Sequence, residues 1–119
     1  MEIINKTKNT LLAKDIVIAN TPFKRIRGLL GKKEFREGQA LILKPCNSIH
    51  TFFLRFAIDV IFVDKHNKVI EAISCLKPFR LTRVYWLSVL AIELPAGIIQ
   101  SSSTYNGDTL TIEGHPLLC

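Results

Sequence analysis

Apolar and polar residues along this chain form short blocks, and most blocks have the length and spacing of β-strands. Residues 2–5 and 11–19 predict two strands joined through the polar stretch 6–10. Residues 40–43 form a short apolar run before Pro45, as a buried strand would. The runs 60–63 and 89–92 are apolar at every position, which predicts two central strands covered on both faces.

The spacing changes after residue 20 and predicts a short amphipathic helix over 22–31. Thr21 is a good N-cap, and Pro22 suits the first helical position. The basic residues of this segment are expected to face outward. The apolar face, at i, i+3 and i+7 spacing, consists of Phe23, Ile26 and Leu30.

The second half of the chain predicts a hairpin, a helix and a last strand. The hairpin covers 59–76, with Asn67 in the left-handed conformation that its short loop requires. A helix over 95–102 is expected after the strand that contains 89–92, and the turn at Asn106-Gly107 leads into a strand at 109–113. The predicted fold class is α+β, a mostly antiparallel sheet curled into a half-open barrel with two short helices.

Composition limits the class of protein. A chain of 119 residues with 48% apolar residues fits one domain over 1–119 with an ordered core. No segment has the apolar length of a signal peptide or a membrane span, so we expect a soluble, cytoplasmic protein without membrane insertion. The three cysteines lack paired spacing and are expected to be reduced thiols. Trp86, the one tryptophan, is expected to pack in the core.

The net charge of +6 is unevenly distributed and permits two interpretations. The basic clusters could attract an anionic partner, or they could form a solvated surface that keeps the protein soluble. Nucleic acid is an unlikely partner because neither cluster has interleaved aromatic residues for base stacking. The clusters are Lys24, Arg25, Arg27, Lys32, Lys33 and Arg36, and then Lys77, Arg80 and Arg83.

Residues 46–64 contain the strongest candidates for chemistry, because polar side chains there interrupt an aromatic and β-branched run. Cys46 and His50 lie four residues apart and would need a turn at Asn47-Ser48 to form a nucleophile and base pair. A metal site would combine these two with one of Asp59, His66, Cys75 or His115, but nothing in the spacing selects that set. No metal or cofactor is therefore expected.

The stretch His50-Thr51-Phe52-Phe53-Leu54-Arg55 permits another interpretation. Arg55 could pair with Asp59 or Asp108 inside a network that stabilises the fold, or it could bind a carboxylate or phosphate in a polar pocket. Glu93 interrupts an apolar strand; its simplest place is at the solvent or in an ion pair, and Asp108 most simply caps its own turn. Either could also line a site.

Five ordered blocks of this sequence resemble the family called domain of unknown function 192. The resemblance covers roughly 10–113 and implies a small β-rich domain with short helices and no established activity. The chain departs from the family pattern at Leu54, usually methionine, and at Asn67, often glycine. The blocks are 27–31, 48–55, 58–64, 93–97 and 107–110; the matching polar positions are Arg27, His50, Thr51, Arg55, Asp59 and Asp108.

We therefore hypothesise non-catalytic binding of a small polar or anionic ligand, or of a peptide. Arg55 would supply charge-assisted hydrogen bonds, His50 a switchable donor, and Asp59 the orientation of both; Thr51 completes the site. The alternatives are a hydrolase that uses Cys46 or a His50-carboxylate pair, and an interaction module with a protein partner. An exposed apolar patch around 85–87 without a pocket would favour the module.

Overall fold

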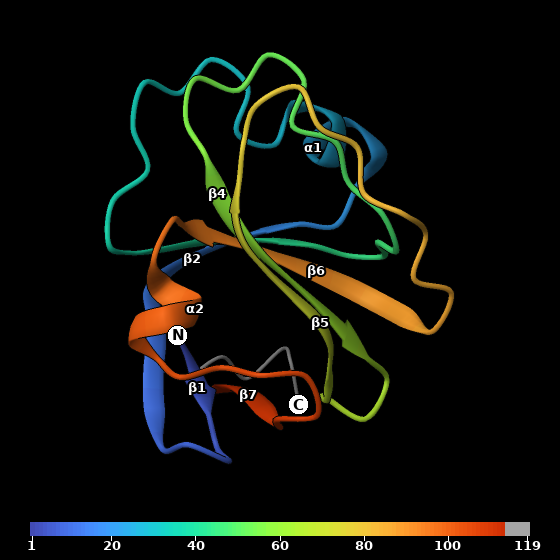
Figure 1. The fold of residues 1–119 in the computed structure, drawn as a ribbon. Helices are drawn as coiled ribbons and strands as arrows, with labels where there is room; N and C mark the ends of the chain where they lie inside the picture. The colour runs from blue at the N-terminus through green and yellow to red at the C-terminus, as the bar shows by residue number, and fades with distance from the viewer. Residues whose placement is uncertain (114–119) are drawn as a thin grey trace.

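The computed structural model describes residues 1–113, so His115 and the expected fraying of the C-terminal tail lie outside the described residues. Seven strands and two short helices alternate along this part of the chain (Figure 1). They are β1 (Glu2–Asn5), β2 (Thr10–Ala19), α1 (Pro22–Arg27), β3 (Gly38–Leu43), β4 (Ile58–Asp64), β5 (Val69–Leu76), β6 (Ser88–Pro95), α2 (Ile98–Ser101) and β7 (Leu110–Glu113).

All seven strands belong to one sheet with the order β5-β4-β6-β3-β2-β1-β7. Every pairing is antiparallel except that of β2 with β3, which α1 connects. The sheet curls until its two edges approach one another, where the Val69 N–H donates to the Asp108 carbonyl and the Leu110 N–H to the Asn67 carbonyl, both at 2.8 Å. The predicted half-open barrel is confirmed.

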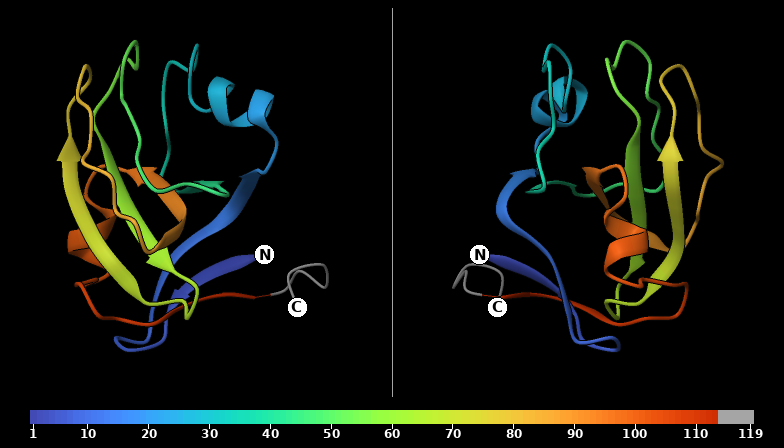
Figure 2. Two further views of the ribbon diagram at one scale, coloured as in Figure 1. Left: turned by 90° about the vertical axis from the view of Figure 1, so that its right-hand side faces the viewer. Right: turned by 60° about the vertical axis from the view of Figure 1, so that its left-hand side comes forward.

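The barrel has two differently built ends (Figure 2). At one end lie α1 and the loops that follow α1, β3 and β5, and at the other lie β1 and β7. Inner strands are buried on both faces, as the uniformly apolar runs in β4 and β6 predict. Alternate residues of these strands therefore contribute to two separate core clusters.

We call the core cluster next to α1 the α1-side core. It contains Ile58, Val60 and Phe62 from β4, and Ala91 from β6. Ile61 and Val63 of β4, which alternate with these residues, belong to the second cluster, on the other face of the sheet. Strand alternation places Glu93, two residues after Ala91, on the α1-side face. The remaining members of the α1-side core are Ala19, Leu29, Leu41, Leu43, Ile49 and Leu54.

The local predictions for the hairpin and the first strand pair are confirmed. β4 and β5 pair over the predicted range, and Asn67 has φ 63°. β1 pairs with β2 as expected. The Thr21 hydroxyl accepts a hydrogen bond from the Lys24 N–H at 3.2 Å, so the predicted N-cap is also present.

The predictions for the helices and for two aromatic side chains need correction. Helix α1 ends at Arg27 because Gly28 follows with φ 41°, and α2 is a single turn. Phe23 is 72% exposed and Trp86 is 82% exposed, so neither packs in the core as expected. Helix α1 ends before Leu30, which was expected on its apolar face, and Trp86 lies in the turn before β6.

Candidate functional site

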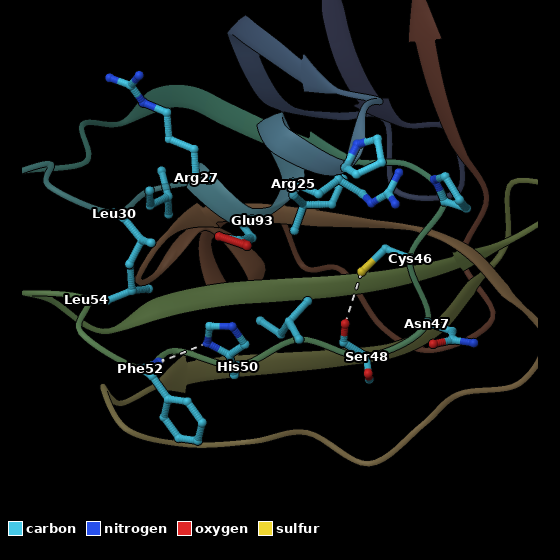
Figure 3. A pocket seen from close by; sticks show the side chains of 16 residues that line it. Arg25, Arg27, Leu30, Cys46, Asn47, Ser48, His50, Phe52, Leu54 and Glu93 are labelled. Carbon is cyan, nitrogen blue, oxygen red and sulfur yellow. Dashed lines mark hydrogen bonds between the residues drawn. The ribbon is translucent and has the colours of Figure 1, made fainter.

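A pocket of about 360 Å³ opens at the end of the barrel that carries α1. One wall comes from α1 and the turn after it, and the opposite wall from the segment between β3 and β4 (Figure 3). Strand β6 contributes Glu93. The lining combines eight apolar residues with seven polar or charged ones, and small-molecule sites also pair an apolar surface with polar groups that orient the ligand. The apolar lining residues are Pro22, Leu29, Leu30, Leu43, Pro45, Ile49, Phe52 and Leu54.

Glu93 is the most unusual side chain in the pocket. It pairs in register with Leu41 of β3 and Val60 of β4, so apolar strands flank it on both sides, and only 6% of it is exposed. Among residues 1–113 its carboxyl group has neither a hydrogen-bond nor an ion-pair partner. Burial without a partner raises its pKa to about 8, so Glu93 is mainly protonated at neutral pH.

Cations line the same pocket without pairing with Glu93. Arg25 is half-buried, and its guanidinium extends toward the Cys46 side of the pocket (Figure 3). Arg27 lines the rim and points away from the Glu93 carboxyl group. The expectation that all basic residues of this helix face outward is therefore wrong for Arg25.

His50 lies on the wall opposite α1 (Figure 3). Its Nδ1 accepts a hydrogen bond from the Phe52 N–H at 3.3 Å, and its ring stacks on the Phe52 ring with centroids 5.0 Å apart. With Nδ1 occupied as an acceptor, neutral His50 carries its hydrogen on Nε2. His50 can therefore donate a hydrogen bond to a group in the pocket.

Cys46 also lines the pocket, but its surroundings favour the thiol. Its Sγ donates a hydrogen bond to the Ser48 carbonyl at 3.1 Å. Burial raises the pKa of the Cys46 thiol, and the nearby Glu93 carboxyl group also raises it while Arg25 opposes the rise. Because the thiolate is the nucleophile, these surroundings do not activate Cys46.

Thr51 and Asp59, two of the predicted site residues, are fully buried and hydrogen-bonded to the backbone. The Thr51 hydroxyl donates to the Lys77 carbonyl at 2.6 Å and accepts from the Arg80 N–H at 2.9 Å, which ties the pocket wall to the loop after β5. The Asp59 carboxylate accepts three backbone N–H hydrogen bonds, from Cys75 at 2.9 Å, Gly97 at 3.1 Å and Ile99 at 2.8 Å.

Asp108 lies away from the pocket, where the two edges of the sheet approach. It accepts hydrogen bonds from Asn5, Lys8 and the Tyr105 N–H, each at 3.0 Å. Burial alone would raise the pKa of Asp108, but these hydrogen bonds and the Lys8 charge outweigh it and hold the pKa below its usual range. The expected turn cap is present, enlarged by Asn5 and Lys8.

Arg55 is exposed, outside the pocket, and makes no ion pair with Asp59 or Asp108, so the expected pairing is wrong. A turn at Phe52 and Phe53, where Phe53 has φ 66°, breaks the strand alternation on which that expectation depended. Of the six predicted site residues, the pocket brings together only Arg27 and His50. A ligand-binding role for the other four stays a prediction.

The expectation that Glu93 lies at the solvent or in an ion pair is wrong, because its side chain is buried. The sequence contains an indication of this burial, namely a single carboxylate inside an apolar block that predicts a central strand. A charge at such a position is costly unless it is paired or serves a site. Cys46 is a candidate from the sequence, but the sequence does not show that Cys46 and Arg25 lie in one pocket with Glu93, because that depends on the pairing of β3 with β6.

Within the described part of the chain, no three His, Cys, Asp or Glu side chains gather closely enough to hold a metal ion. Residues 1–113 also contain no helix with the length and apolar character needed to cross a membrane.

Known proteins resemble this chain in sequence and in fold. The chain is 33% identical to a UPF0127 protein of Thermococcus sibiricus, covering 93% of this chain and 74% of that protein. It is 34% identical to a UPF0127 protein of Pyrococcus horikoshii, with 91% and 96% covered. A crystal structure of a protein of unknown function from Novosphingobium aromaticivorans has the same fold, with TM-score 0.82, 15% identity, and 94% and 84% covered.

The family described as "Uncharacterized ACR" matches residues 3–112, nearly the whole described chain. The matched range contains all five blocks of resemblance in the sequence. The chain belongs to this family, the domain of unknown function 192.

Proposed function

We propose that the protein binds a small ligand with an anionic group, without catalysis, in the pocket beside α1. The observation that carries this proposal is that half-buried Arg25 lines one pocket together with Glu93, whose carboxyl group has no partner among the described residues, and with eight apolar side chains. A pocket of about 360 Å³ lies within the size range of small-molecule sites. The ligand's apolar part would contact the leucines, and its polar groups would meet the polar side chains.

Arg25 is the best-placed residue for the anionic group. A guanidinium binds carboxylate or phosphate through two parallel hydrogen bonds, and partial burial strengthens them. His50 would add one hydrogen bond from Nε2 across the pocket. Thr51 and Asp59 would contribute by fixing the wall and α2 rather than by contacting the ligand, because their side-chain oxygens already have backbone partners.

The experiment uses hexanoate and inorganic phosphate as probes, titrated calorimetrically at low ionic strength. We expect at least one probe to bind, and Arg25→Gln to weaken it roughly tenfold or more because a charge-assisted hydrogen bond is lost. Arg80→Gln is the matched control, an exposed arginine outside the pocket. If neither probe binds the wild type, or if both variants bind equally well, the proposal is wrong.

A hydrolase is the second candidate, favoured by the presence of Cys46, His50 and Glu93 in one pocket. Its nucleophile and base are not assembled, however. The Cys46 thiol donates to Ser48, the His50 Nδ1 accepts from Phe52, and no hydrogen bond joins any two of the three residues. A parallel assay measures hydrolysis of p-nitrophenyl hexanoate by the wild type and two variants. Turnover that Cys46→Ser or His50→Gln abolishes would favour the hydrolase.

An interaction module is the third candidate. Trp86 and Leu87 are strongly exposed, which favours that alternative, whereas Tyr85 packs against Phe62. The pocket beside α1 counts against it, because the module is favoured by an exposed patch without a pocket. We therefore place ligand binding first.

A further inference from the structure

We propose that the ligand of this pocket carries a primary ammonium group and that Glu93 binds it, as a buried carboxylate that completes an ion pair only with the ligand. This inference rests on the proposed function, because it assigns the chemistry of the same site. It extends that function from an anionic ligand to one with both a cation and an anion.

Strand register fixes Glu93 in its place. Leu41 and Val60 lie opposite it on the two neighbouring strands, and Ala91 precedes it on the same face. None of these side chains can donate a hydrogen bond. In Figure 3 the carboxyl group lies between the segment that carries Arg25 and the segment that carries His50, inside the pocket that both walls enclose.

The cations of the pocket leave Glu93 unpaired. Arg27 points away from it, and Arg25 extends toward Cys46. Among the described residues the carboxyl group has no hydrogen-bond donor at all, although its oxygens face the pocket. A buried acid in this state gains most from a charged donor, because a charge-assisted hydrogen bond is about twice as strong as a neutral one. A small ammonium donor meets this need.

The pocket wall also suits a short alkyl chain. Leu29, Leu43, Ile49 and Leu54 are buried members of both the pocket lining and the α1-side core. A methylene chain between an ammonium and a carboxylate would contact these side chains while its ends met Glu93 and Arg25. The ligand class is therefore an amino-carboxylate with an apolar spacer, and 6-aminohexanoate is a suitable probe.

Binding of the ammonium group would release one proton. The Glu93 O–H bond breaks, its electron pair stays on the carboxylate, the ammonium donates to that carboxylate, and the proton passes to the buffer. Because the pKa of free Glu93 is about 8, about nine tenths of the molecules are protonated at pH 7. The groups that line the pocket with it, and that remain in Glu93 variants, are Arg25, Arg27, Cys46 and His50.

The test is calorimetric titration of the intact chain with hexylamine, which lacks the anionic group. Repeating the titration in buffers of different ionisation enthalpy gives the number of protons released. We expect nearly one proton per hexylamine bound at pH 7 and nearly none at pH 9.5, where Glu93 is already ionised. Glu93→Gln should weaken hexylamine binding at least roughly tenfold and abolish the proton release. Glu37→Gln, at an exposed carboxylate outside the pocket, is the matched control.

Further probes separate this inference from the proposed function. Hexanoate lacks the ammonium group, so its binding depends on Arg25 and should survive Glu93→Gln. The inference is overturned if hexylamine binds without proton release at pH 7, or if Glu93→Gln binds it as well as wild type. If hexylamine binds with proton release but neither hexanoate nor phosphate binds, only the proposed function, the anionic part, is overturned. With both proposals correct, 6-aminohexanoate binds more tightly than either single-ended probe and loses affinity in both variants.

Discussion

The carboxyl group of Glu93 lies on the inner strand β6, where neighbouring strands present Leu41 and Val60. Removing the group from water without giving it a partner favours the uncharged acid and raises its pKa to about 8. Its ordinary value is 4.5. Between about pH 4.5 and about pH 8, Glu93 therefore keeps its proton in the folded protein and loses it in the unfolded chain. This difference links the residue to the stability of the whole protein.

The stability of the wild-type protein should fall as pH rises from about 4.5 to about 8. Below about pH 4.5 Glu93 is protonated in both the folded and the unfolded chain. Between about pH 4.5 and about pH 8 unfolding releases the Glu93 proton, so a rise in pH favours the unfolded chain. The contribution of Glu93 is at most about 1.4 kcal/mol per pH unit. Glu93→Gln should remove this slope, and urea unfolding at pH 5, 6, 7 and 8 measures it.

Glu37→Gln controls for the loss of a carboxylate as such, and it should keep the wild-type slope because Glu37 is exposed. Parallel curves for the wild type and Glu93→Gln across the window would contradict the raised pKa.

At the scale of elements, Asp59 joins three parts of the fold. It lies in β4, and its carboxylate accepts hydrogen bonds from Cys75 of β5 and from Gly97 and Ile99 at the start of α2. The single turn of α2 has no side-chain cap from its own N-cap residue, Gly97. Asp59 therefore does the work of a cap from a neighbouring strand, and this explains why an acid is buried there.

Asp59→Ala should destabilise the protein by about 3 kcal/mol or more, because three N–H groups lose their acceptor. The free energy of unfolding, measured by urea denaturation at pH 7, checks this. Asp15→Ala at an exposed position of β2 is the matched control and should change it by less than about 0.5 kcal/mol. A loss at Asp59 as small as that at Asp15 would show that the carboxylate is not needed for the fold.

Sequence patterns predicted the elements that depend on neighbouring residues. The β4–β5 hairpin and the Thr21 cap are fixed by local turn and capping chemistry, so they could be predicted. The exposure of Phe23 and Trp86 could not, because it depends on which distant segments cover them. Periodicity alone does not show whether a covering element exists.

At the scale of the whole molecule, the half-open barrel was predictable but the pocket was not. Runs apolar on both faces indicated a curled sheet, since both faces need cover. The pocket, by contrast, brings Arg25, Cys46 and Glu93 together through the pairing of β6 with β3 and the crossover by α1. No local sequence pattern predicts that strand order. Glu93 therefore stands out in the sequence as a carboxylate inside an apolar strand, whereas its proximity to Arg25 and Cys46 is visible only in the structure.

We expect Glu93 to be protonated in the free protein at neutral pH and to lose its proton when it binds the cation of a ligand. Carbon-13 NMR of the glutamate side-chain carboxyl groups tests this, with the Glu93 signal assigned by its loss in Glu93→Gln. We predict a Glu93 signal with a midpoint near pH 8. At pH 7 this signal should move to the ionised position when 6-aminohexanoate is added. A midpoint in the ordinary range of glutamate, or a signal that stays protonated at saturating 6-aminohexanoate, would show that Glu93 does not bind a cation in this way.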